Sequence, residues 1–72
     1  KDRNADALKL FSALENDYPN YFGGYYGSAV IYQQDDNTKM AINYFKKVIE
    51  YSSANEQWAS EYAQKMIDKL KE

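Results

Sequence analysis

The chain matches itself when it is shifted by 34 residues, and this offset constrains the fold more than any other feature. The aligned pairs are Ala7 with Ala41, Phe11 with Phe45, Leu14 with Val48, Ala29 with Ala63, and Tyr32 with Met66. All of them fall at positions of helical spacing within their segments. A fixed period of about 20 to 50 residues is typical of arrays in which each unit stacks on its neighbours. The offset therefore predicts a repeated helix-turn-helix unit.

Apolar residues at helical spacing predict four helices and no strand. The first helix begins near Asp2 or Asn4, either of which can cap it, and it ends before Pro19, because the residue ahead of a proline leaves the helical region. The fourth helix is opened by a capping box of Ser53 and Glu56. The second and third helices cover about residues 21–34 and 38–51. Since the turns between the helices are short, neighbouring helices run antiparallel and the fold class is all-α.

The segment 18–34 contains no charged residue, and it holds all three glycines of the chain. Each of Gly23, Gly24 and Gly27 weakens a helix by about 1 kcal/mol relative to alanine. We therefore expect this helix to need close approach to a neighbouring helix or to be held in place by its neighbours. The Asp35-Asp36-Asn37 cluster that follows is predicted to be a turn, because these residues tolerate left-handed backbone conformations.

The spacing of the larger residues resembles the tetratricopeptide repeat, a unit of 34 residues with the pattern W-x2-L-G-x2-Y, then A-x3-F, then P. Residues 22–55 contain Tyr25-x2-Ser28-Ala29-x2-Tyr32, then Ala41-x3-Phe45, then Ser53 at the proline position. The chain departs from the pattern at Tyr25, Ser28 and Asp36, where tryptophan, leucine and glycine are usual. An earlier half repeat, Ala7-x3-Phe11 followed by Pro19, also fits.

The resemblance implies one domain that is an array of helix-turn-helix units in a right-handed superhelical stack. Residues 1–19 would hold the second helix of a partial repeat, residues 20–53 one full repeat, and residues 54–72 a closing helix. Lys1 then falls at a turn inside a repeat, so we expect the chain to be a fragment of a longer one. The exposed face of the first helix, with Leu8 and Leu10, is expected to pack on residues upstream or on a second copy.

Composition excludes most catalytic chemistry. Without cysteine or histidine there is no disulfide, no thiolate or imidazole metal site, and no Ser-His or Cys-His nucleophile. The acidic pairs Asp35-Asp36 and Glu15-Asp17 lack the spacing of a calcium loop, and they lie at helix ends, where caps and turns are expected. We therefore predict no enzyme activity, no cofactor and no metal.

Charge and hydropathy also exclude two kinds of partner. The net charge is −2, and the lysines are interspersed with acidic residues, so a nucleic-acid surface is not expected. The uncharged segment 18–34 is too polar and too interrupted by glycine and proline for direct membrane insertion.

In the tetratricopeptide family, the first helices of successive repeats line a concave groove that holds peptides or partner helices. Carried over to this chain, the candidate groove residues are Tyr26, Val30, Gln33 and Gln34 from the second helix and Gln57, Ser60 and Gln64 from the fourth. This surface is uncharged, and it lacks the lysine and asparagine pattern with which chaperone-binding relatives hold a carboxylate terminus. Tyr26 either anchors the groove or packs on a neighbouring helix, and the spacing leaves both open.

The resemblance implies a non-catalytic protein-protein interaction module whose partner is a protein or a peptide. Two alternatives stay open: a structural spacer or oligomerisation segment of a larger bacterial envelope protein, and a helical appendage of an enzyme whose active site lies elsewhere. The string from Phe45 to Tyr51 is similar to repeats of bacterial outer-membrane assembly and cell-division lipoproteins. That similarity favours the periplasm or cell envelope over the cytoplasm.

Overall fold

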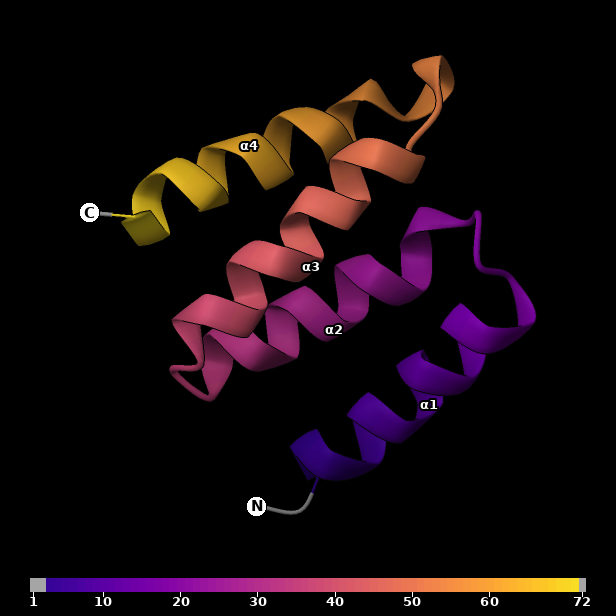
Figure 1. Ribbon diagram of the computed structural model, residues 1–72, viewed down its shortest axis with the longest axis vertical. Coiled ribbons are helices and arrows are strands. Elements are labelled where there is room, and N and C mark those ends of the chain that lie inside the picture. Colours follow the sequence, from indigo (N-terminus) through magenta and orange to yellow (C-terminus); the bar gives the residue numbers. More distant parts are fainter. Residues whose placement is uncertain (1–2, 72) are drawn as a thin grey trace.

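The computed structural model describes residues 3–71 and consists of four helices joined by short turns (Figure 1). They are α1 (Arg3–Asp17), α2 (Phe22–Gln34), α3 (Thr38–Tyr51) and α4 (Gln57–Lys71), with a 3₁₀ turn, η1 (Ala54–Glu56), directly ahead of α4. Within the described residues there is no strand. The predicted all-α array of antiparallel helix-turn-helix units is confirmed.

The turns form as their residues predict, with one correction. Asp36 has a φ of 61°, the left-handed conformation expected in this turn. The Ser53 backbone N–H donates to the Glu56 carboxylate at 3.0 Å, and the predicted capping box is present. Asn4 does not cap α1 because the helix already includes Arg3; its amide donates instead to Asp35 Oδ1 at 2.7 Å. The other candidate cap, Asp2, lies outside the described residues.

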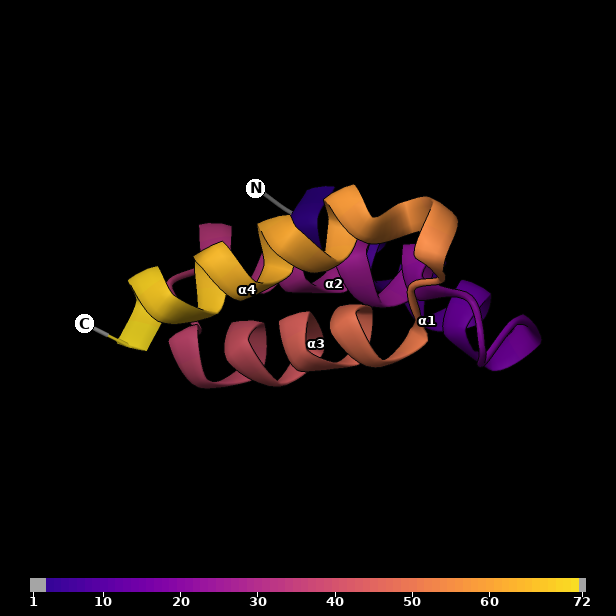
Figure 2. The same cartoon turned by 90° about the horizontal axis from the view of Figure 1, so that it is seen from above.

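The helices make a flat molecule of 34 × 33 × 15 Å. Each helix packs on the next one along the chain, so that α2 lies between α1 and α3, and α3 lies between α2 and α4. Figure 2 shows α2 and α4 in one layer with α3 below them. The molecule is thin because each helix has room for only one or two neighbours.

The core is centred on α3. Its most deeply buried apolar residues, each at most 1% exposed, are Ala29, Ala41, Phe45, Val48, Ala59 and Ala63. Four of these six are alanines, and small side chains let helix backbones approach closely. Phe45 is the largest fully buried side chain, and its ring meets that of Tyr62 edge-on with centroids 6.1 Å apart.

The two members of the 34-residue match differ in burial. Ala41 and Phe45 of α3 are fully buried, whereas their counterparts Ala7 and Phe11 of α1 are only half-buried, and α1 contains no buried residue. The difference follows from the packing, because α3 has a helix on either side whereas α1 packs chiefly on α2.

Two glycines of α2 are needed for close approach to α1, as the sequence predicts. A Cβ on Gly24 would lie 2.8 Å from Glu15 Cγ and 3.1 Å from the backbone oxygen of Phe11. A Cβ on Gly27 would collide with the Phe11 ring. The α1–α2 contact is also held by the Ser28 hydroxyl, which donates to Glu15 Oε2 at 2.7 Å. Any side chain at these glycines would push the two helices apart.

Candidate binding site on α1, α2 and α4

A shallow apolar pocket of about 350 Å³ opens between α1 and α2. It is lined by Phe11 of α1 and by Gly23, Tyr26, Gly27, Val30 and Ile31 of α2. The pocket exists because two glycines one turn apart leave α2 without side chains on this face. Its volume is near the lower end of the range for ligand pockets in proteins.

Tyr26 lies at the boundary between this pocket and α4. Its ring is 6.0 Å from that of Trp58 and 5.7 Å from that of Tyr62, both on α4, while the same side chain lines the pocket. Burial, followed by the influence of Tyr62, raises the pKa of the Tyr26 hydroxyl above 10.0. The alternatives for Tyr26 are therefore not exclusive, because one side packs on a helix and the other borders the pocket.

Beyond Tyr26 the aromatic surface continues across α4. We define the aromatic patch as Tyr21, Phe22, Tyr26, Trp58 and Tyr62, whose rings form a chain with neighbouring centroids 5.3 to 6.3 Å apart. Trp58 is 57% exposed and Tyr21 is 48% exposed, whereas Phe22 is buried beneath them. Large rings that are partly exposed and held by their neighbours are the side chains that most often anchor protein partners.

The predicted groove residues divide into two groups. Val30 and Tyr26 line the pocket; Gln33, on the same helix, is half-buried and Gln34 is exposed. On α4, Ser60 is half-buried.

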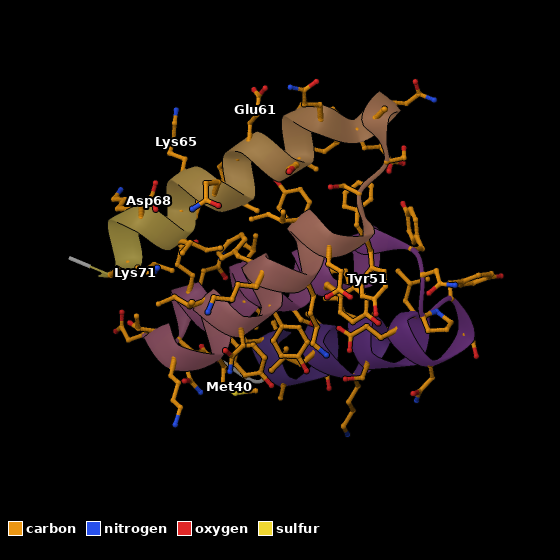
Figure 3. All side chains as sticks on the ribbon, turned by 45° about the horizontal axis from the view of Figure 1, so that its top comes forward. Met40, Tyr51, Glu61, Lys65, Asp68 and Lys71 are labelled. Carbon is orange, nitrogen blue, oxygen red and sulfur yellow. The ribbon has the colours of Figure 1, made fainter. Side chains whose placement is uncertain are left out.

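The two predicted glutamines of α4 are engaged along their own helix. The Gln57 amide donates to Glu61 Oε2 at 3.0 Å and the Gln64 amide to Asp68 Oδ1 at 3.1 Å. Figure 3 shows Glu61, Lys65 and Asp68 along the outer side of α4. These amides therefore form a polar face of α4, separate from the apolar pocket.

Sequence reasoning missed Phe11, Gly27 and Ile31 as pocket residues. A signal was present in the spacing of Gly23 and Gly27, which places two missing side chains on one face of a helix. The involvement of Phe11 depends on how α1 crosses α2, and the spacing within either helix does not specify that crossing.

The other tyrosines form a second stack between α2 and α3. The rings of Tyr51 and Tyr25 are 5.2 Å apart, those of Tyr25 and Tyr44 are 6.3 Å apart, and those of Tyr44 and Tyr32 are 5.4 Å apart. Figure 3 shows Tyr51 pointing from the end of α3 toward this stack. The Lys47 ammonium lies 5.4 Å from the centre of the Tyr25 ring, at cation–π distance.

Tyr25 also ties this stack to the turn after α1. Its hydroxyl donates to the backbone oxygen of Pro19 at 2.8 Å. Burial, followed by Tyr51, Glu15 and Glu50, raises the pKa of Tyr25 above 10.0. The stack is therefore a packing feature that holds α2 on α3 and on the α1–α2 turn.

Two properties of the described residues bear on other kinds of site. Residues 3–71 contain no group of three or more acidic, histidine or cysteine side chains placed to hold a metal ion. None of the helices in that range has both the length and the apolar character that crossing a bilayer requires.

Comparisons of the chain with protein-family models, with curated proteins and with solved structures gave no match. The resemblance to the tetratricopeptide repeat therefore rests on the spacing of the residues themselves.

Proposed function

We propose that this chain is a tetratricopeptide-like, non-catalytic interaction module that binds a peptide or a partner helix at the α1–α2 pocket and the adjoining aromatic patch. The observation that carries the proposal is the position of Tyr26, which borders the pocket and is at the same time fixed by Trp58 and Tyr62. A ring that is held in place before binding loses little conformational freedom when a partner arrives.

The chemistry of the pocket defines the partner segment. The lining residues are uncharged and apolar apart from the hydroxyl of Tyr26, so an aliphatic or aromatic side chain of the partner would enter the pocket. The exposed indole of Trp58 and the hydroxyls of Tyr21 and Tyr62 would then meet the partner's backbone at the rim. An acidic tail finds no cation in the pocket lining, so the preferred segment is apolar at its centre and uncharged.

The proposal is tested with a random-peptide library displayed on phage, panned against the purified protein. Binding of the enriched peptides is then measured by fluorescence anisotropy for the parent protein and two variants. Val30→Glu places a carboxylate in the apolar pocket and should weaken binding at least about tenfold, which corresponds to about 1.4 kcal/mol. Gln64→Glu adds the same charge on the polar face of α4 and should change binding less than about twofold.

Thermal unfolding of both variants, followed by circular dichroism, establishes that they are folded. Enrichment of peptides that bind the parent and Val30→Glu equally would refute the pocket as the binding site. A Gln64→Glu variant that is weakened as much as Val30→Glu would return the site to the wider groove predicted from the sequence.

A further inference from the structure

One face of α1 carries residues spaced alternately by four and three positions. We call Arg3, Ala7, Leu10, Leu14 and Asp17 the α1 stripe. This spacing keeps side chains on one side of a helix, as at the contact positions of a two-helix pair. Leu10, at its centre, is 72% exposed and is the most exposed large apolar side chain among the described residues.

The internal match indicates what such a face normally contacts. The counterpart of Leu10 on α3 is Tyr44, which stacks between Tyr25 and Tyr32 of α2. The counterparts of Ala7 and Leu14 on α3 are both buried. On α3 this face is thus covered by a helix, whereas on α1 the same face is half-buried at its flanks and exposed at its centre.

The charges at the ends of the stripe select the covering helix. Arg3 lies in the first turn of α1 and Asp17 in its last turn. Each of these charges has the sign that the dipole of its own helix disfavours at that end. A second α1 that runs antiparallel would bring Asp17 to the amino end of its neighbour and Arg3 to the carboxyl end, where both signs are favourable. With Leu10 on the axis, Arg3 of each copy faces Asp17 of the other.

We propose that two copies of this chain associate through the α1 stripe, with the two α1 helices antiparallel about a twofold axis at Leu10. The contact is isologous, so the same residues serve both partners and the assembly closes at two copies. Because the stripe is a single helix face, the dimer is weak and dissociates at micromolar concentrations. The stripe contains no residue that lines the pocket, so this proposal does not depend on the proposed peptide site.

Sedimentation velocity over a range of concentrations measures the association of the protein. Leu10→Glu places two carboxylates opposite each other on the axis and should abolish the dimer. Its matched control is Ser12→Glu, which adds the same charge at an exposed position on the opposite side of α1 and should leave the dimer unchanged.

A charge exchange tests the antiparallel arrangement. Arg3→Asp and Asp17→Arg, each alone, turn both end pairs from attraction into repulsion and should weaken the dimer about tenfold. The double variant restores opposite charges at both ends and should return to the parent affinity. An equimolar mixture of the two single variants should form a mixed dimer.

Three results would overturn the proposal. The first is a protein that stays monomeric up to millimolar concentration, which would assign the stripe to a segment or partner outside this chain. The second is a dimer that Ser12→Glu weakens as much as Leu10→Glu. The third is a dimer that Val30→Glu abolishes and Leu10→Glu does not, which would place self-association at the pocket. Circular dichroism of each variant confirms that it is folded before association is compared.

Discussion

The matched pair Phe45 and Phe11 gives the sharpest test of how unevenly this chain is stabilised. The two residues stand 34 positions apart in the same sequence context, yet Phe45 is fully buried and Phe11 is half-buried. Burying about 150 Å² of a phenylalanine side chain at about 25 cal/mol per Å² contributes about 4 kcal/mol. We expect Phe45→Ala to lower the free energy of unfolding by about 4 kcal/mol and Phe11→Ala to lower it by about 2 kcal/mol.

The size of the molecule makes this difference decisive. A domain of 72 residues has a total stability of about 4 to 11 kcal/mol, so the loss at Phe45 approaches the lower limit. If Phe45→Ala does not fold, Phe45→Leu and Phe11→Leu keep the comparison, because a leucine removes only part of each ring's contacts.

The measurement is urea unfolding followed by far-UV circular dichroism, at the lowest protein concentration that gives a signal, so that self-association contributes little. The fluorescence of Trp58, the single tryptophan, provides a second probe of the same transition. Equal losses at the two positions, or a larger loss at Phe11, would refute the view that α1 is less covered than α3.

Two further predictions concern the glycines and the tyrosines. Gly24→Ala should lower stability by about 1 to 2 kcal/mol, since its Cβ would press on Glu15 and on the backbone of α1, whereas Gly23→Ala should raise it by up to about 1 kcal/mol because only the exposed ring of Tyr21 has to move. The midpoints of urea unfolding compare them, and a stabilised Gly24→Ala would contradict the close approach. Because burial raises the pKa of Tyr25 in the folded state, its contribution to stability should be complete below pH 10.0 and lost as the pH rises above it. Unfolding midpoints between neutral and alkaline pH measure this loss, Tyr25→Phe should reduce the slope, and a midpoint that does not fall above pH 10.0 would show the reasoning to be wrong.

The helices were predictable because each boundary depends on local chemistry. Pro19, the Asp35-Asp36-Asn37 turn and the capping box at Ser53 act within a few residues of their own positions, and α3 has the predicted bounds. The prediction at Asn4 was wrong because its side chain makes a contact with Asp35, 31 positions away, that the local pattern does not contain.

The pocket was less predictable because its shape comes from residues that lack side chains. Gly23 and Gly27 read as weak points of a helix, and only the crossing of α1 over α2 turns them into the floor of a pocket. Val30 and Tyr26 were predicted as surface residues by the resemblance, whereas Phe11 was assigned to a core position and lines the pocket instead. A pattern within one helix predicts which face is apolar, but not which neighbour leaves it uncovered.

The two first-type helices, α2 and α4, share a register in the sequence but not a packing face. On α2, Gly24 and Ser28 face α1. Their counterparts 34 residues later are Trp58 and Tyr62, which are 57% and 37% exposed.

Side-chain size accounts for this difference. At Gly24 even a Cβ would collide with the neighbouring helix, so an indole at the equivalent place cannot enter. Instead, α4 buries the adjacent face that carries Ala59, Ala63, Met66 and Ile67, and Trp58 and Tyr62 are left at its margin against Tyr26. The aromatic patch is thus a consequence of the repeat being inexact: two large residues at positions that hold small ones in α2 create the exposed rings that we propose as the binding surface.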